Sequence, residues 1–469
     1  MNTSKQTSSK KSAVILGKQR TYSEVIEFLD KSWSCKKDQT LNTIKALNTQ
    51  LGSPADKLKT ILVAGTNGKS LTVDFITKLL KEEGLNVGSF TAPHILTYNE
   101  RLWLNGEIVN NKSFTDATNE VINAAEELKL QPHASELLTM TAIWWFRNSK
   151  VDVAVLEVPT SKWWDPVNIC KSSVFAITRL VWNTEDQKEI EKNIKEVTDG
   201  IQKDSWVVSA DQSKFNLELM QTQTEKIKGH WAMPIRKLAI LTYPFEQLHG
   251  RSAALAERAA QLFLEKNVVD SNTVVSDSLL IKTKGQRGRP TIEAKRKQEL
   301  NPQKTVEHFW KDTVTNLPGR FQLLDKEKPT ILLDTADNID AINNLLLGIK
   351  LLHYKRPLKG LVIIVGCENK DLENPEFLKI IRYFFKKTSG QIIFCPVRAT
   401  AMTDGETWDI DNITNEAKNM KIKAKAAKNF VDAFDSAKKL VDERNGLVVI
   451  TGCRSMITEY WDNKGIKKI

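Results

Sequence analysis

The segment Gly65-Thr66-Asn67-Gly68-Lys69-Ser70 holds the residue types in this sequence that are best suited to binding a phosphate group. A lysine can place a point charge on a phosphate, and the serine hydroxyl that follows it can bind Mg²⁺. The spacing G-x-x-G-K-S is shorter than the usual G-x-x-x-x-G-K-[ST] pattern. The alternative is a plain turn between a strand and a helix, in which the glycines serve only the backbone conformation.

The residues on either side of this segment predict the elements that would hold it. Residues 61–64 form an apolar run typical of a buried strand, and Val73, Ile76, Leu79 and Leu80 fall on one face of a predicted helix. A glycine turn between a strand and a helix directs backbone N–H groups and the positive end of the helix dipole toward an anion. We therefore predict a nucleoside triphosphate site that uses ATP and Mg²⁺.

Strand and helix patterns alternate along most of the chain, which predicts an α/β fold. Apolar runs typical of strands occur at 60–64, 85–91, 151–158 and 174–181, and again at 330–333, 361–365, 391–395 and 447–451. Predicted helices include 21–58, 115–129, 135–148, 185–203 and 252–266. Short apolar runs separated by helices favour parallel sheets that are covered on both faces. We predict a second α/β domain from residue 317 onward and place the boundary near Pro318-Gly319-Arg320.

The composition argues against several classes of protein. Apolar residues make up 41% of the 469 residues, and no run approaches the length of a membrane-spanning helix. The first residues are polar and lack the apolar core of a secretory signal. The five cysteines lie far apart and form no zinc or disulfide pattern. We expect a cytoplasmic protein with a disordered tail at residues 1–20.

The net charge of +11 would attract anionic ligands, although lysines are spread along the whole chain. Residues 282–304 are basic, poor in apolar residues and broken by Gly and Pro, as in an exposed insertion. The motif Arg287-Gly288-Arg289-Pro290 within them is similar to a DNA minor-groove hook, but a solvated loop also explains this single motif. We therefore favour the solvated loop over a nucleic-acid partner, and we expect no membrane partner and a monomeric protein.

A second group of motifs resembles the folylpolyglutamate synthases and dihydrofolate synthases of the Mur ligase superfamily. The stretch 89–109, SFTAPHILTYNERLWLNGEIV, is similar to the family pattern T-S-P-H-L, then F-N-E-R-I and a short N-G hairpin. The motifs YSEVIEFLD, LGSP, VAGTNGK, VDVAVLEV, LPGRF and the pair Arg398-Ala399 follow in the family's order across residues 21–465. The resemblance implies a P-loop-containing three-layer domain at 21–316, which includes the basic insertion, and a smaller Rossmann-like domain at 317–469. It also implies an active site between them.

The resemblance further implies a reaction. ATP phosphorylates a substrate carboxylate to an acyl phosphate, and the amine of an incoming glutamate then attacks to form an amide bond. Phosphoryl transfer of this kind depends on cations and on positioning more than on covalent chemistry by the protein. The implied substrates are ATP, glutamate and a folate-like carboxylate, and Mg²⁺ would accompany the nucleotide.

The resemblance assigns roles to particular residues. The implied nucleotide site consists of Gly65, Thr66, Asn67, Gly68, Lys69, Ser70, Leu71, Arg320 and Asp334. Ser70 and Glu157 would bind the metal ion, and Lys69, Glu157 and His94 would be the catalytic residues. His94 is expected to line the cleft near the acceptor; a loop histidine bonded to the backbone is the alternative.

Several positions depart from the family pattern. Ala92 stands where the family has a serine that helps to hold Mg²⁺, and Thr184 replaces the metal-binding histidine. Thr198 lies near the position of the family's modified lysine, and Asp337 replaces the histidine of D-G-A-H-N. These changes keep most of the nucleotide half but alter the second metal site.

Three functions stay open from the sequence. The chain is an active glutamate ligase, an ATP-binding relative that has lost or changed its catalysis, or a nucleic-acid-binding protein that uses the basic insertion. The loop on the folate side is altered, since Pro159, Ser161 and Lys162 stand where the family has glycines, directly before Trp163 and Trp164. We predict that Trp163, Trp164 and Trp182 line or fill the acceptor site, and ordinary core packing is the alternative.

Overall fold

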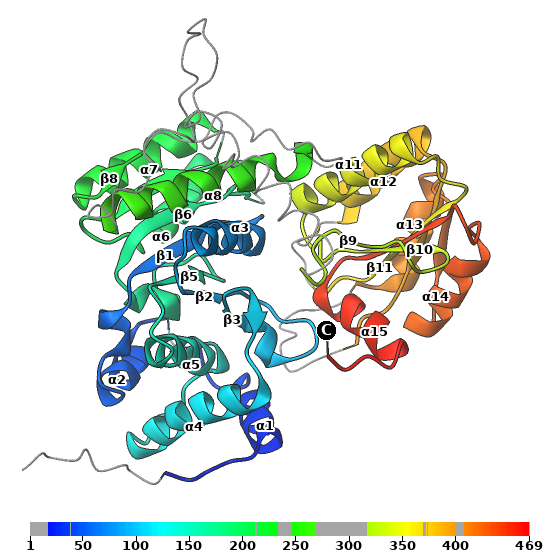
Figure 1. Cartoon of the computed structure of the whole chain (residues 1–469). Coiled ribbons are helices and arrows are strands. Elements are labelled where there is room, and N and C mark those ends of the chain that lie inside the picture. Colours follow the sequence, from blue (N-terminus) through cyan, green and yellow to red (C-terminus); the bar gives the residue numbers. More distant parts are fainter. Residues whose placement is uncertain are drawn as a thin grey trace, which may run out of the picture.

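The protein contains two α/β units, each built on one sheet (Figure 1). The computed structural model describes residues 17–37, 39–182, 184–211, 213–232, 246–267, 317–368, 372, 374–398 and 408–468. The sheet of the first unit has eight strands in the order β4-β3-β2-β5-β1-β6-β7-β8, and that of the second has six in the order β13-β12-β11-β14-β10-β9. The predicted α/β fold class is confirmed.

The first sheet is parallel except at one edge. Its strands are β1 (Thr60–Ala64), β2 (Val87–Phe90), β3 (Leu102–Leu104), β4 (Glu107–Ile108), β5 (Val153–Glu157), β6 (Ser172–Ile177), β7 (Trp206–Ser209) and β8 (His230–Trp231). Strands β3 and β4 pair antiparallel with their neighbours, and Asn105 and Gly106 join them with φ angles of 52° and 82°. Two positive φ angles in a two-residue Asn-Gly connection are typical of a tight hairpin, which explains the antiparallel edge.

Helices cover both faces of the first sheet, so this unit has three layers. They are α1 (Tyr22–Ser32), α2 (Asn42–Gln50), α3 (Lys69–Glu82), α4 (Asn111–Glu127), α5 (Ala134–Asn148), α6 (Gln187–Thr198), α7 (Lys214–Lys226) and α8 (Glu246–Asn267). Alternate residues of β1 point to opposite faces. Ile61 and Val63 pack in the core that contains α3 and α8, whereas Leu62 and Ala64 pack in the core formed with α1, α2, α4 and α5.

The second unit is also a covered, mostly parallel sheet. Its strands are β9 (Gln322–Leu324), β10 (Thr330–Leu333), β11 (Leu361–Val365), β12 (Gln391–Phe394), β13 (Ala424–Ala426) and β14 (Leu447–Thr451). Its helices are α11 (Ile339–Lys355), α12 (Asn374–Lys387), α13 (Ile410–Asn419), α14 (Phe430–Lys439) and α15 (Arg454–Asn463). Among the described strands of this sheet, only β9 runs antiparallel to its neighbour. Three strands predicted from apolar runs, at 330–333, 361–365 and 447–451, have the bounds that we expected.

Some expectations need correction. The region 21–58 is not one continuous helix, because α1 ends at Ser32 and α2 begins at Asn42. Arg20, assigned to the tail, is 6% exposed and bonds to Asn119 and Glu126 of α4. Residues 1–16 of the predicted tail and the insertion at 282–304 lie outside the described residues.

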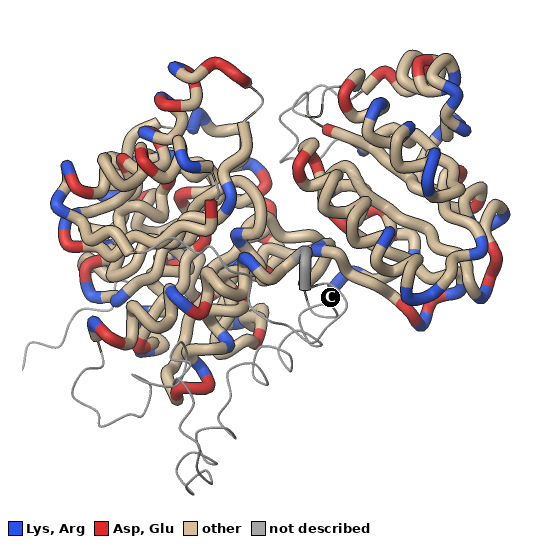
Figure 2. Tube along the Cα trace, turned by 90° about the horizontal axis from the view of Figure 1, so that it is seen from above, with Lys and Arg blue, Asp and Glu red and all other residues tan. Residues whose placement is uncertain are grey.

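Charged residues of both signs are mixed over the two units. Seen from above, Lys and Arg alternate with Asp and Glu along most surface helices of the described chain (Figure 2). This view therefore offers no extended basic face on the described elements. Within the described residues, no helix is long and apolar enough to cross a membrane.

Candidate functional site

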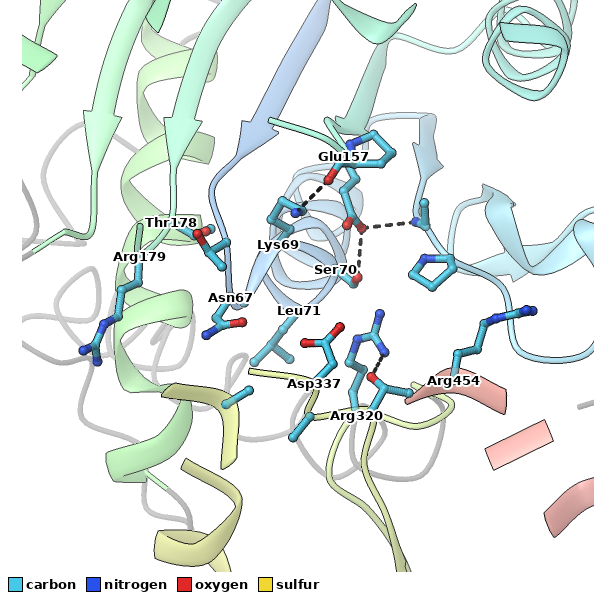
Figure 3. Close-up of a pocket in the computed structure, with 18 of the residues that line it drawn as sticks. Asn67, Lys69, Ser70, Leu71, Glu157, Thr178, Arg179, Arg320, Asp337 and Arg454 are labelled. Atoms are coloured by element: carbon cyan, nitrogen blue, oxygen red, sulfur yellow. Dashed lines mark hydrogen bonds between the residues drawn. The ribbon is translucent and has the colours of Figure 1, made fainter. Parts of the chain in front are cut away.

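A cavity of about 850 Å³ is lined by residues of both units (Figure 3). Many of the first-unit residues that line it lie at or just after the carboxyl ends of β1, β2, β5 and β6, which are adjacent in the sheet and run parallel, and others come from helices such as α5 and α8. Residues of the second unit follow β10, β11 and β14, which are also adjacent and parallel. The carboxyl ends of two sheets therefore meet at one cavity, and this edge is where ligands bind in open α/β sheets.

The loop at residues 65–70 has a conformation that requires its glycines. Gly65 has a φ of +130°, and a Cβ there would lie 2.0 Å from the Oγ1 of Thr178. Gly68 has a φ of +89° and precedes α3 without any side-chain cap. The first N–H groups of a helix have no acceptor inside the helix, so an uncapped N-terminus suits an anion. The geometry thus fits the phosphate site predicted for this loop.

Lys69 is folded back toward the loop and the end of β5. Its Nζ donates to the carbonyl oxygen of Gly65 at 2.9 Å and to that of Pro159 at 3.1 Å. Burial lowers the pKa of Lys69, and the nearby carboxylates of Glu157 and Asp165 oppose that shift. The Lys69 amine is therefore held beside the loop by oxygen atoms that a phosphate could replace.

Glu157 and Ser70 meet at the end of β5. The Ser70 hydroxyl donates to Oε2 of Glu157 at 2.8 Å, and the backbone N–H of Ala92 donates to the same oxygen at 3.2 Å. Glu157 is only 2% exposed, and it lines the cavity together with Ser70. The nearby hydroxyl of Thr178 is buried without a hydrogen-bond partner among the described residues.

These groups fit a magnesium ion. Mg²⁺ takes hard oxygen ligands and is usually held by one or two carboxylates together with phosphates and water. Glu157 and Ser70 offer one carboxylate and one hydroxyl oxygen beside the predicted phosphate site. Among the described residues, no group of three or more His, Cys, Asp or Glu is arranged to hold a metal ion. A metal here would therefore depend on the nucleotide for further ligands.

Two residues predicted to reach the nucleotide from the second unit also line the cavity. Arg320 donates through Nη1 to the Thr335 hydroxyl. Asp334 accepts backbone hydrogen bonds from Phe321 and Ala336, each at 2.8 Å. Burial raises the pKa of Asp334 to about 6, although these bonds and Arg320 oppose the shift. Asp334 thus shapes the turn that carries Arg320, and its predicted contact with the nucleotide stays a prediction.

His94 does not line the cavity, in contrast to the sequence-based expectation. It is 6% exposed, and its Nδ1 accepts a hydrogen bond from Nε of Arg101 at 3.0 Å. Burial, with Arg101 and Arg454 nearby, holds the pKa of His94 well below its usual range. The neutral ring therefore supports Arg101, which lines the cavity in its place.

The loop that carries His94 belongs to the first unit and contacts the second. The side chain of Ile95 is 3% exposed and packs in a core of the second unit. Its carbonyl oxygen accepts a hydrogen bond from the Thr458 hydroxyl at 2.9 Å, and that of His94 accepts one from Nη1 of Arg454 at 3.4 Å. The same loop begins at Ala92, which is bonded to Glu157.

The predicted tryptophan cluster lies outside the cavity lining. Trp163 is 39% exposed, and Trp182 packs against the core of the first unit. Trp164 lies beneath Lys37, whose Nζ is 5.1 Å from the ring centroid. Trp33 and Lys37 line the cavity instead. The sequence signal for them is an aromatic residue followed closely by lysines; it was hidden within the helix predicted at 21–58, whereas in the structure it comes directly after α1.

Three of the altered family positions make local hydrogen bonds: Thr184 just before α6, Thr198 at the end of α6, and Asp337 just before α11. The Thr184 hydroxyl accepts from the backbone of Asp186 at 3.2 Å, and the buried Thr198 hydroxyl donates to Ile194 within α6. Neither residue lines the cavity. Asp337 does line it, and its Oδ1 accepts a hydrogen bond from Asn338 at 3.0 Å. Ala399, of the pair Arg398-Ala399, lies outside the described residues.

Several cavity residues were not predicted. Arg179 follows β6, Asp340 lies in the first turn of α11, and Glu368 and Arg454 follow β11 and β14. Arg179, Glu368 and Arg454 each come two or three residues after a strand that ends at the cavity. The rule that the carboxyl ends of adjacent parallel strands meet at one edge would have found them.

Comparisons with known proteins agree with this architecture. No protein-family model matches the chain. The chain is 27% identical over 323 residues to the dihydrofolate synthase/folylpolyglutamate synthase of Bacillus subtilis. The aligned stretch covers 65% of this chain and 70% of that protein.

Two solved structures match the fold over nearly the whole chain. One is Mycobacterium tuberculosis folylpolyglutamate synthase complexed with ADP, with a TM-score of 0.74, 20% identity, and coverage of 95% of this chain and 98% of that chain. The other is a bifunctional folylpolyglutamate synthase/dihydrofolate synthase with Mn, AMPPNP and L-glutamate bound, with a TM-score of 0.68, 18% identity, and coverage of 96% and 100%. The chain is therefore a distant homologue of the dihydrofolate synthase/folylpolyglutamate synthases, and it shares the fold of the solved ones.

Proposed function

We propose that this protein is an ATP-dependent ligase that adds glutamate to a folate-type carboxylate through an acyl phosphate. The observation that carries this proposal is the meeting of Lys69, Ser70 and Glu157 with Arg320 at one cavity between the two sheets. This arrangement supplies cations for a transferring phosphoryl group and a carboxylate for its metal ion. The names of the relatives support the choice of substrates.

The proposed reaction has two steps. An oxygen of the acceptor carboxylate bonds to the γ-phosphorus of ATP, and the bond to the ADP oxygen breaks. The glutamate nitrogen then bonds to the acyl carbon, phosphate leaves, and a proton passes from the nitrogen to solvent. Mg²⁺ held by Ser70 and Glu157 would neutralise phosphate charge. Lys69 and Arg320 would hold the phosphate oxygens in place from opposite units.

One part of the cavity suits the acceptor. Trp33 lines it, and the guanidinium of Arg101 lies 5.6 Å from the Trp33 ring centroid. Lys37 also lines the cavity, and its Nζ lies over the ring of Trp164. An aromatic ring beside a cation suits a flat molecule that carries a carboxylate, because it offers stacking and charge at once. A folate has both features.

A second candidate is an ATP-binding relative whose catalysis is impaired. The observation in its favour is that two family ligand positions provide no metal ligand here. Ala92 offers only its backbone N–H to Glu157, and Thr184 lies outside the cavity lining. A single protein carboxylate holds the metal less firmly than several would, which lowers the rate of a step that depends on that charge.

The deciding experiment measures ADP release by the purified protein with Mg²⁺, ATP and glutamate, in the presence and absence of dihydropteroate or tetrahydrofolate. We expect acceptor-dependent turnover that Lys69→Ala abolishes. Lys78→Ala is the matched control, because Lys78 lies on the same helix and pairs with Asp74 at 2.8 Å outside the cavity. Nucleotide binding without turnover would replace the first proposal with the second.

A further inference from the structure

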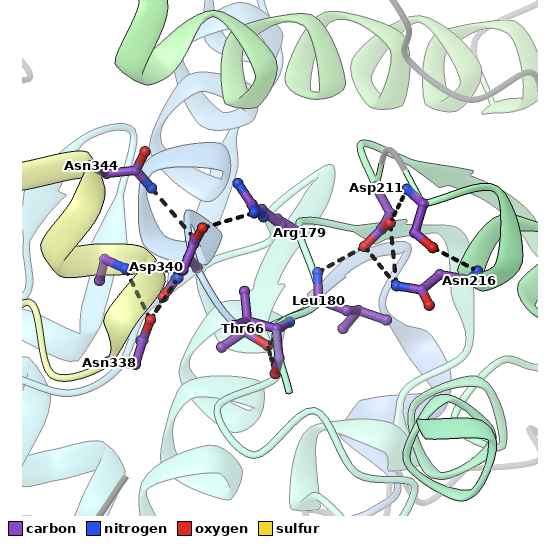
Figure 4. A network of polar contacts seen from close by, with 12 residues as sticks. Thr66, Arg179, Leu180, Asp211, Asn216, Asn338, Asp340 and Asn344 are labelled. Atoms are coloured by element: carbon purple, nitrogen blue, oxygen red, sulfur yellow. Dashed lines mark hydrogen bonds and ion pairs between the residues drawn. The ribbon is translucent and has the colours of Figure 1, made fainter. Parts of the chain in front are cut away.

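One carboxylate of the second unit bonds to two elements of the first. Asp340 lies in the first turn of α11, and its side chain is 11% exposed. Its Oδ1 lies 2.9 Å from Nη2 of Arg179, and its Oδ2 accepts a hydrogen bond from Nδ2 of Asn67 at 2.8 Å (Figure 4). All three residues line the cavity.

The side chain of Asn67 is held from a second direction as well. It donates to Oδ1 of Asn338 at 3.1 Å and accepts from Nδ2 of Asn338 at 3.0 Å. Asn338 caps α11, because its Oδ1 also accepts from the backbone N–H of Ala341. The N-terminus of α11 is thereby fixed against the loop at 65–70.

Arg179 fixes the same loop through its backbone. Its carbonyl oxygen accepts from the N–H groups of Thr66 at 2.9 Å and Asn67 at 3.4 Å. The next residue, Leu180, donates its N–H to Oδ2 of Asp211 at 3.1 Å, which holds this segment from behind. The Arg179 side chain is 51% exposed and reaches from this fixed segment to Asp340.

We propose that Arg179 and Asp340 are positioning residues for the nucleotide. Together with Asn67 they form an interunit clamp that sets the shape of the 65–70 loop before the phosphates bind. A loop that is already ordered loses less conformational freedom on binding, and this raises its affinity for a ligand. The clamp rests on the proposed nucleotide site, but it does not require that the ligase reaction takes place.

The test is ADP binding by calorimetry on the full chain. We expect Asp340→Ala and Arg179→Ala each to weaken ADP affinity about tenfold. The double variant should bind ADP no more weakly than either single variant, because each change breaks the same clamp. Asp340→Asn keeps an acceptor for Asn67 but loses the charge opposite Arg179, so its affinity should fall between those of the wild type and Asp340→Ala. Arg356→Ala is the control, since Arg356 pairs with Asp325 on the surface of the second unit at 3.2 Å.

Other results would overturn the clamp. These are an unchanged ADP affinity in Asp340→Ala, losses that add fully in the double variant, or a lower unfolding midpoint with normal ADP affinity. Failure of the wild-type chain to bind ADP would overturn the nucleotide site and the clamp together. Normal ADP binding without ligase turnover would remove the proposed reaction and leave the clamp to be judged by its variants.

Discussion

Replacement of Glu157 tests the proposed metal end of the cavity. Glutamine has the same size, and its amide oxygen can accept the bonds from Ser70 and Ala92 that the carboxylate now accepts. We expect Glu157→Gln to change the free energy of unfolding by about 1 kcal/mol or less. The lost charge should instead weaken metal-dependent nucleotide binding and lower turnover by at least about 100-fold.

Alanine at the same position should lower stability clearly, in contrast to glutamine. It leaves two buried donors, the Ser70 hydroxyl and the Ala92 N–H, without the acceptor that they share. An unsatisfied buried donor costs about 1–3 kcal/mol, so Glu157→Ala should lower the free energy of unfolding by about 2–6 kcal/mol.

The assays are urea unfolding with a chelator present and titration of ADP binding with Mg²⁺. Glu136→Gln is the matched control, because Glu136 is also buried, accepts from the backbone of His133 at 2.9 Å, and does not line the cavity. It should affect stability but leave the Mg²⁺ dependence unchanged. An unaltered Mg²⁺ dependence in Glu157→Gln, or full stability in Glu157→Ala, would refute this reasoning.

Three further predictions follow from the described geometry. Gly65→Ala should lower the free energy of unfolding by about 2–5 kcal/mol, since it adds a steric clash to an unfavourable φ. Gly84 also has a positive φ, but the space around it is open, so Gly84→Ala should lower the free energy of unfolding by only about 1 kcal/mol in the same urea titration. Ala92→Ser should lower the Mg²⁺ concentration needed for half-maximal ADP binding. Thr184→His should not, because Thr184 lies outside the cavity lining. An equal gain from both substitutions would contradict a metal site beside Ala92 and away from Thr184. Burial raises the pKa of Glu257 in α8 to about 7, because it disfavours the charged carboxylate in the folded state. The resulting contribution to stability is complete below the ordinary pKa of the group and is lost as pH rises toward 7. Glu257→Gln should therefore be the more stable chain at pH 8 and lose this advantage near pH 5, as measured by urea unfolding at both pH values.

The nucleotide half of the cavity could be predicted because its signals are local. A buried strand, glycines with positive φ angles and an amphipathic helix follow one another within residues 60–82, and the structure places β1, the loop and α3 there. The position of Glu157 was also accessible, since it ends a strand that pairs in parallel with β1. Motifs of this kind need no knowledge of distant contacts.

Side-chain direction in loops could not be predicted in the same way. His94, Ile95 and Arg101 belong to one short region, yet the histidine is buried, the isoleucine enters the second core and the arginine lines the cavity. Which side chain takes which place depends on packing against α15, more than 350 residues away in the sequence. The pairing of Asp340 with Arg179 and Asn67 is equally invisible in a single sequence, because it joins the two units.

The loop that contains Ala92 and Ile95 links the separation of the two units to the affinity for a cation. If the units moved apart, Ile95 would have to leave its buried place, at a cost of about 1.5–3 kcal/mol. Otherwise the loop would follow the second unit, and the bond from Ala92 to Glu157 would break. By reciprocity, a cation that prefers the intact Glu157 arrangement would hold the units together, and a more open form would bind that cation more weakly.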